Sequence, residues 1–169
     1  MQTKNQNNIV LIGMAGAGKS SVGIVLAKKL NLNFIDVDTL IEEKQQAPLQ
    51  QIVNDLGITG FRKLEEKVIL HMQQQNHVIA TGGSAIYSET GMTHLKQSSL
   101  FILLDVPLSV LQQRVGDFSS RGLIKAEGQS FEQLFQERLP LYQKYADITI
   151  PCDGKSVTAI CQLICKKIF

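Results

Sequence analysis

Short runs of consecutive apolar residues recur along the chain, separated by longer stretches of mixed polarity. Four runs are rich in Ile, Val, Leu and Phe and a fifth is weaker; they span residues 8–13, 34–38, 77–82, 100–106 and 147–151. Consecutive apolar positions are typical of parallel strands that are covered on both faces. The runs therefore predict the strands of a buried parallel sheet.

Longer segments between and after these runs place their apolar residues at helical spacing. They span residues 19–30, 60–75, 130–147 and 156–169. Strands that alternate with helices predict an α/β domain whose parallel strands are joined by right-handed crossovers. A length of 169 residues suits one domain. No internal repeat or linker divides the chain, so we expect a single domain over residues 1–169.

Residues 116–128 follow neither spacing. The segment is bounded by Gly116 and Gly128 and contains Gly122. An irregular stretch of this length inside a compact domain is either disordered or a functional lid. We expect a mobile lid over about residues 116–128.

Charge and cysteine content narrow the classes of partner. A net charge of +2 is too small to attract nucleic acid or a membrane surface by bulk electrostatics. The polar first residues, MQTKNQNN, lack the apolar core of a signal peptide. Cys161 and Cys165 share an apolar helix face, which favours free buried thiols over a metal site. Free thiols suit a reducing compartment. We therefore expect a cytoplasmic protein with neither nucleic-acid nor membrane partners.

Residues 13–20 have the sequence GMAGAGKS, which matches the phosphate-loop pattern G-x-x-x-x-G-K-[ST] between a predicted strand and a predicted helix. Glycines let the backbone curl so that its N–H groups point at phosphate oxygens, and the helix adds its positive N-terminal end. Lys19 can reach the β- and γ-phosphates, and the Ser20 hydroxyl can ligate Mg²⁺. The alternative is a glycine-rich turn without a ligand. The full pattern in this context favours a site for a nucleoside triphosphate.

Two carboxylates follow the second predicted strand. No N-K-x-D element for reading guanine is present, and a small domain with a lid is typical of a kinase for a small molecule. Asp36 and Asp38 are two residues apart at the strand's C-terminal end, where ligands of parallel sheets bind, so we expect them to point to the same side. One can hold Mg²⁺ and the other can accept a proton from an attacking hydroxyl. Alternatively, Asp38 is a helix N-cap. Asp105 also follows an apolar strand, but we favour Asp36 for the metal.

Arg62 lies near the start of a predicted helix, within the sequence GFRKLEEK. A cation in the first helical turn opposes the helix dipole. We therefore expect Arg62 to have another use, such as a bidentate grip on a substrate carboxylate, with Glu65 or Glu66 fixing its orientation. The alternative is an exposed ion pair on the helix surface.

These motifs together resemble the shikimate kinase family. The resemblance covers residues 8–150 and rests on six motifs in family order: GMAGAGKS, DVD, GFRKLEE, ATGGSA, SSRGLI and ERLPLYQKYAD. It implies a five-stranded parallel sheet with helices on both faces, and a lid that closes over ATP. It also implies ATP-dependent phosphorylation of a hydroxyl of shikimate, with Mg²⁺ as cofactor and ATP as co-substrate. We expect the enzyme to be a monomer.

The resemblance further implies a role for each matching residue. The implied ATP-binding residues are Gly13, Ala15, Gly16, Ala17, Gly18, Lys19, Ser20, Ser21, Arg114 and Arg121. The implied metal ligands are Ser20 and Asp36. The implied shikimate-binding residues are Asp38, Arg62, Gly82, Gly83, Ser84 and Arg138. Asp38 is the base, Lys19 and the lid residue Arg121 act on the transferring phosphate, and the two substrate arginines hold the carboxylate.

The chain departs from the family pattern at three positions. Ser84 replaces the third of three glycines, Gly122 replaces a lid proline, and Ile58 stands where many members have glutamate. These departures leave two alternatives: a kinase of the same fold for another small polyol or acid, such as gluconate, and a nucleotide-binding protein that has lost catalysis. The presence of every expected catalytic residue argues against the second.

Overall fold

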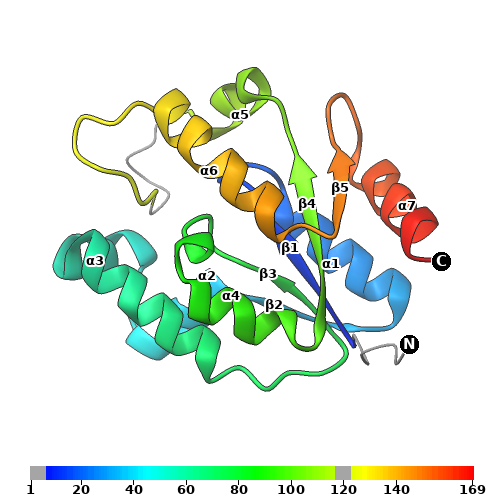
Figure 1. Cartoon of the computed structure of the whole chain (residues 1–169), viewed down its shortest axis with the longest axis horizontal. Coiled ribbons are helices and arrows are strands. Elements are labelled where there is room, and N and C mark those ends of the chain that lie inside the picture. Colours follow the sequence, from blue (N-terminus) through cyan, green and yellow to red (C-terminus); the bar gives the residue numbers. More distant parts are fainter. Residues whose placement is uncertain (1–6, 117–122) are drawn as a thin grey trace.

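Five parallel strands form one sheet at the centre of the molecule, in the order β2-β3-β1-β4-β5 (Figure 1). The computed structural model describes residues 7–116 and 123–169. The strands are β1 Asn8–Ile12, β2 Asn33–Asp36, β3 His77–Ala80, β4 Ser99–Asp105 and β5 Ile148–Pro151. Each predicted apolar run contributes one strand, so the parallel sheet is confirmed.

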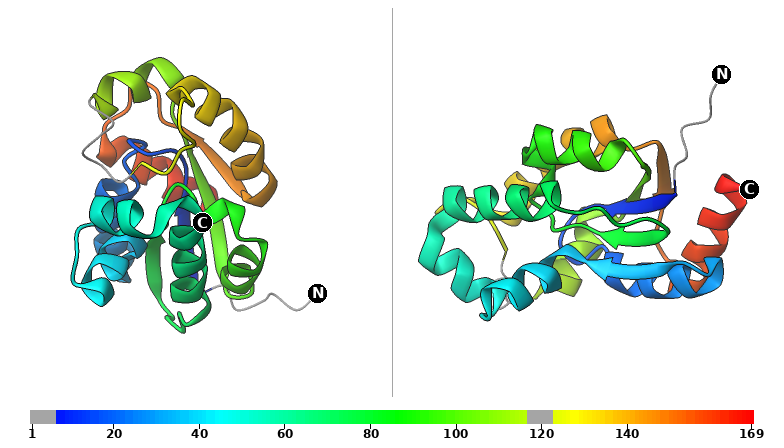
Figure 2. Two further views of the ribbon diagram at one scale, coloured as in Figure 1. Left: turned by 90° about the vertical axis from the view of Figure 1, so that its left-hand side faces the viewer. Right: turned by 90° about the horizontal axis from the view of Figure 1, so that it is seen from below.

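Helices cover both faces of the sheet. They are α1 Lys19–Leu30, α2 Val37–Gln45, α3 Leu49–Leu70, α4 Glu89–Lys96, α5 Leu108–Val115, α6 Phe131–Tyr145 and α7 Val157–Ile168, with a short 3₁₀ helix, η1, at Ala85–Tyr87. Helix α1 contacts β1, β2, β3 and α7, whereas α4 and α6 contact β4. Figures 1 and 2 show α1 and α7 on one face of the sheet and α4 and α6 on the other.

Strand β1 lies in the middle of the sheet, and all five of its residues are buried. Val10 pairs with Ile79 of β3 and with Phe101 of β4, which are both buried. A strand with neighbours on both sides and helices on both faces has no position that faces solvent. This location explains why the sequence of β1 is apolar throughout and does not alternate.

Three short helices were not predicted from the apolar pattern. Helices α2, α4 and α5 have nine, eight and eight residues and bury only two or three each, too few for a clear helical period. The predicted helix over residues 60–75 has different bounds in the structure: it starts earlier and ends at Leu70, so residues 71–75 are not helical. Helix α3 begins at Leu49 and is kinked at Gly57, whose φ of 67° and ψ of 176° suit glycine.

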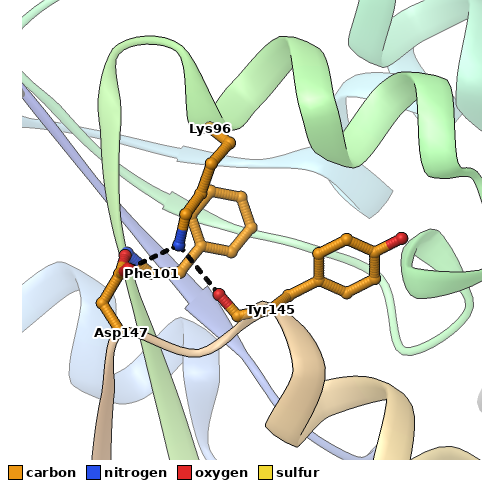
Figure 3. A network of polar contacts seen from close by, with 4 residues as sticks. All are labelled: Lys96, Phe101, Tyr145 and Asp147. Atoms are coloured by element: carbon orange, nitrogen blue, oxygen red, sulfur yellow. Dashed lines mark hydrogen bonds and ion pairs between the residues drawn. The ribbon is translucent and has the colours of Figure 1, made fainter.

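A polar network joins the end of α4 to the start of β5 (Figure 3). Lys96 Nζ lies 2.6 Å from Asp147 Oδ1 and donates to the backbone oxygen of Tyr145 at 2.9 Å. Asp147 Oδ2 accepts from the backbone N–H of Phe101 at 2.8 Å, and Lys96 Nζ lies 4.8 Å from the centre of the Phe101 ring. The network therefore fixes three elements to one another at the end of the sheet where β5 begins.

All three cysteines are free thiols. Cys152 and Cys161 are buried, and Cys165 is partly buried on α7 beside the apolar core. The expected apolar face of the last helix is thus confirmed. No helix in the described part of the chain combines the length and the apolarity that crossing a membrane requires.

Candidate active site

A cavity of about 360 Å³ opens among the segments that follow β1, β2 and β3. The loops after parallel strands meet at one edge of the sheet, which is where α/β domains bind ligands. The cavity collects most of the residues that the sequence singled out. Those that line it are Ala15, Gly16, Gly18, Lys19, Ser20, Ser21, Asp36, Asp38, Gly82, Gly83, Ser84 and Arg138.

The phosphate loop curls around the ammonium group of Lys19. Lys19 Nζ donates to the backbone oxygens of Gly13 at 2.7 Å and Met14 at 2.8 Å. Gly18 is the N-cap of α1, in the left-handed region with φ 88°, and provides no side-chain cap. The first N–H groups of α1 therefore face the loop, where they can bind an anion. Burial lowers the pKa of Lys19 to about 8, with the charges of Asp38 and Asp36 opposing the shift.

Asp36 is held next to Ser20. The Ser20 hydroxyl donates to Asp36 Oδ2, and Asp36 Oδ1 accepts from the backbone N–H of Asp38 at 3.0 Å. Asp36 ends β2 and is the N-cap of α2. A hydroxyl and a carboxylate side by side are the oxygen ligands that Mg²⁺ prefers. Asp105 is exposed at the end of β4 and is not among the residues that line the cavity.

Asp36 and Asp38 do not share one face of a strand, so that prediction was wrong. Strand β2 ends at Asp36, and Asp38 lies in the first turn of α2. The N-cap of that helix is Asp36 and not Asp38, because the Asp36 carboxylate accepts the free N–H groups of the turn. Both side chains still reach the cavity.

Asp38 and Glu65 flank the backbone of Gly82. A Cβ atom on Gly82 would lie 2.5 Å from Glu65 Oε1 and 2.7 Å from Asp38 Oδ1, so any larger residue would displace these carboxyl groups. Burial and the neighbouring charge of Asp36 raise the pKa of Asp38 to about 6. Burial also raises the pKa of Glu65 to about 7, and the hydrogen bond from Ser84 opposes that shift. Both carboxyl groups thus titrate close to neutral pH.

Ser84 is connected to Glu65. The Ser84 hydroxyl is buried and donates to Glu65 Oε2 at 2.6 Å, while Glu65 Oε1 has no hydrogen-bond partner among the described residues. Of the two glutamates considered as partners of Arg62, only Glu65 reaches the site. Glu66 instead accepts from Ser88 and Thr90.

Arg138 lies inside the protein, with only 1% of its surface exposed. Its Nη2 donates to the backbone oxygen of Ile124, and its Nη1 lies 2.8 Å from where a Cβ atom on Gly83 would be. Tyr142, one helical turn further along α6, donates its hydroxyl to the backbone oxygen of Gly83 at 2.7 Å. Glycine at position 83 therefore leaves room for the guanidinium group beside the cavity.

Arg62 lies at the margin of this site. It follows the first turn of the α3 segment that begins after Gly57, so the helix-dipole argument applies only weakly to it. Its guanidinium carbon lies 3.8 Å from the centre of the Tyr87 ring. Arg62 is not among the cavity-lining residues, and Ile58 packs against the apolar core.

A second cavity, of about 430 Å³, lies on the other side of the phosphate loop. Ala17, Arg114 and Lys155 are among the residues that line it. Arg114 Nη1 donates to the backbone oxygen of Gly16 at 3.2 Å, which ties α5 to the loop. Arg121 and Gly122 lie outside the described residues, as does much of the expected lid.

Sequence reasoning missed Tyr87, Tyr142 and Lys155. Tyr142 could have been found, because it stands four residues after Arg138 in a predicted helix and so shares its face. Tyr87 and Lys155 belong to no helical or strand period and match no motif, so nothing local marked them.

Comparison with known proteins identifies the family that this chain resembles. The sequence model of the family described as shikimate kinase matches residues 15–169. Shikimate kinase of Sulfurihydrogenibium sp. (strain YO3AOP1) is 38% identical over 162 residues, which cover 95% of this chain and 97% of that protein. Shikimate kinase of Haemophilus influenzae (strain PittEE) is 40% identical over 155 residues, which cover 89% of this chain and 86% of that protein.

Two solved structures are similar over almost the whole chain. Shikimate kinase from Acinetobacter baumannii in complex with shikimate superposes with a TM-score of 0.89 at 33% identity, covering 98% of this chain and 94% of that one. Shikimate kinase from Aquifex aeolicus superposes with a TM-score of 0.83 at 32% identity, covering 95% of each.

Proposed function

The chain belongs to the shikimate kinase family, and we propose that it transfers the terminal phosphoryl group of ATP to a hydroxyl of shikimate, giving shikimate 3-phosphate and ADP. One observation carries the proposal beyond the family. A single cavity joins the phosphate loop at Lys19 to the Asp38 carboxyl group and to the buried guanidinium of Arg138. Phosphorylation of a hydroxy acid requires a site for the phosphate donor, a group that accepts the hydroxyl proton and a fixed cation for the carboxylate.

The nucleotide is proposed to lie across the phosphate loop. Its phosphates would meet Lys19 and the N-terminus of α1, and its base would enter the second cavity beside Arg114. The lowered pKa of Lys19, about 8, still leaves most of its amine protonated at pH 7. Lys19 can therefore neutralise charge on the transferring phosphate.

Magnesium is proposed to bind at Ser20 and Asp36. The pair fits the ion, because Mg²⁺ is commonly held by one or two protein oxygens together with phosphate and water oxygens. When bound, the ion neutralises charge on the phosphate oxygens. The hydrogen bond between the Ser20 hydroxyl and Asp36 keeps these two side chains together.

Asp38 is proposed to accept the proton of the attacking hydroxyl. Its pKa of about 6 lies just below neutral pH, so the group is mostly ionised yet more basic than an ordinary aspartate. The absence of a side chain at Gly82 lets the Asp38 carboxyl group lie against the backbone, where it would face the substrate hydroxyl. Arg138 and Arg62 would hold the carboxylate of shikimate through charge-assisted hydrogen bonds.

Several further assignments are proposals of the same kind. Residues 116–128 would form the lid, and Arg121 would reach the transferring phosphate when the lid closes, which also excludes water. We further propose that the enzyme is a cytoplasmic, single-domain monomer; its free cysteines suit a reducing compartment.

The test is ADP release from ATP and Mg²⁺ with and without shikimate. We expect release to depend on shikimate and the product to carry its phosphate on a ring hydroxyl. No shikimate-stimulated release at millimolar shikimate would overturn the proposal. A panel of other small hydroxy acids and polyols, including gluconate, in the same assay tests the alternative acceptor, which the buried Ser84 side chain in the cavity favours.

A further inference from the structure

Two guanidinium groups lie against one aromatic ring beside the substrate cavity. The guanidinium carbon of Arg62 is 3.8 Å from the centre of the Tyr87 ring, and that of Arg138 is 5.5 Å from the same centre. Arg62 comes from α3, Arg138 from α6 and Tyr87 from η1. Three elements that are far apart in the sequence therefore meet at this ring.

Each of the two arginines keeps a buried donor, its Nε atom, without a hydrogen-bond partner among the described residues. Within residues 7–116 and 123–169, neither forms an ion pair with a carboxylate. Arg138 is buried and Arg62 is partly buried. The charges of Glu65 and Glu137 act on both arginines, and the electron-rich face of the Tyr87 ring adds a direct contact to each guanidinium group.

The Tyr87 ring is fixed from both ends. Its backbone N–H donates to the backbone oxygen of Ser84 at 3.1 Å, and its hydroxyl donates to Glu137 Oε1. The other oxygen of Glu137 accepts from Gln129 at 2.9 Å. Glu137 precedes Arg138 on α6, so the hydroxyl ties the ring to the helix that carries one of the arginines. Burial raises the pKa of Tyr87, so the ring stays neutral and its hydroxyl remains a donor.

We propose that Tyr87 is a positioning residue that holds Arg62 and Arg138 together so that both can bind the carboxylate of the substrate. The inference rests on the proposed function, because it assigns the two arginines to shikimate. Unused donors on two guanidinium groups at one ring suit a carboxylate, whose two oxygens accept several charge-assisted hydrogen bonds. Tyr87 contacts the arginines and acts on the substrate only through them.

The test replaces Tyr87 and follows shikimate binding. Tyr87→Met keeps an apolar side chain of similar reach without a ring, and we expect the KM for shikimate to rise about tenfold, while kcat and the KM for ATP stay within about threefold. Tyr87→Phe retains the ring and loses the hydroxyl, with its bond to Glu137 and its contact with Arg138, so most of the affinity for shikimate should return. An equal loss of shikimate affinity in both variants, or an unchanged KM for shikimate in Tyr87→Met, would overturn the inference.

A second readout separates positioning from a general packing role. Shikimate methyl ester lacks the negative charge that the arginines would bind, so its Kd in the presence of ADP should be nearly the same for wild type and Tyr87→Met. A variant that loses as much affinity for the ester as for the acid contradicts the inference. If Tyr87→Met does not fold, the same comparison uses Tyr87→Leu and Tyr87→Phe. Failure of the wild-type protein to phosphorylate shikimate would instead overturn the proposed function.

Discussion

At the scale of single residues, the two adjacent glycines after β3 make room for charged side chains. The space that a Cβ atom would occupy is filled at Gly82 by Glu65 and Asp38 and at Gly83 by Arg138. The glycines thus let three ionisable groups reach the backbone that lines the cavity. That Gly82 and Gly83 bind shikimate stays a prediction.

Replacing the proposed base should slow the chemical step. We expect Asp38→Asn to lower kcat by about 10²–10⁴, the usual contribution of a general base, and to leave ATP affinity within about threefold. In the wild type, kcat/KM should fall as pH drops through about 6, because the Asp38 carboxylate becomes protonated. Steady-state kinetics from pH 5 to 8 measure both effects. Asp55→Asn, on an exposed part of α3, is the control and should change neither kcat nor the pH dependence of kcat/KM.

Removing the Ser84 hydroxyl should raise the pKa of Glu65. Ser84→Ala takes away the donor that favours the ionised form of Glu65, so the pKa of Glu65 should rise above its value of about 7. We therefore expect a larger share of Glu65 to be protonated at pH 7, which an NMR titration of the Glu65 carboxyl carbon measures. Ser88→Ala removes a similar hydroxyl bound to Glu66 outside the site and should leave the Glu65 titration unchanged. An unshifted Glu65 titration in Ser84→Ala would falsify this role.

At the scale of elements, the site depends on two helices whose buried faces each carry a charge. Phe61, Glu65, Val68 and Ile69 are buried on α3, and Phe131, Leu134, Arg138 and Tyr142 are buried on α6. Burying a charged residue on the apolar face of a helix costs free energy unless the charge is paired or hydrogen-bonded. This spacing is the signal in the sequence that favours a site role for Glu65 and Arg138 over an exposed surface position.

Loss of the polar network at the end of α4 should cost stability without affecting the site. Lys96→Met removes a partly exposed ion pair and a hydrogen bond to Tyr145, so we expect the free energy of unfolding to fall by about 1 kcal/mol. Lys144→Met removes an exposed lysine nearby and should change the free energy of unfolding by less than about 0.5 kcal/mol. Urea unfolding measures both. A Lys96→Met loss no greater than that of Lys144→Met would show that the network in Figure 3 contributes little.

At the scale of the whole molecule, the phosphate loop joins elements on both sides of the sheet. The loop leaves β1, starts α1 and accepts a hydrogen bond from Arg114 on α5. Asp36 connects it to α2 through Ser20. A ligand on this loop therefore contacts residues whose positions depend on several elements at once.

Nucleotide binding should stabilise the folded chain as a unit. At about 100 times its Kd, ADP should raise the free energy of unfolding by about 2.7 kcal/mol through mass action. We expect a single transition whose midpoint moves to higher temperature with ADP concentration. In Lys19→Met the same ADP concentration should produce a much smaller shift, because Lys19 is the cation at the phosphates. An equal shift in both proteins would mean that ADP binds elsewhere.

Much of the fold and part of the site followed from the sequence alone. The five strands were predictable because central parallel strands are apolar at consecutive positions, and the phosphate loop because its glycines, Lys19 and Ser20 are contiguous. The short helices were not, since α2, α4 and α5 bury too few residues to show a period. The break in β2 at Asp36 was also missed, because the N-cap that ends the strand is defined by hydrogen bonds to the next turn.

The sequence by itself determined the five strands, the longer helices, the phosphate loop and the residue types available for the chemistry. Only the tertiary structure decided which of them meet. Ser84 contacts Glu65 across 19 positions of the chain, and the hydroxyl of Tyr87 contacts Glu137 across 50. No local pattern encodes such pairs, because they depend on how α3, η1 and α6 pack above the sheet. The same packing buries the two carboxyl groups at Gly82 and so moves their pKa values toward neutral pH.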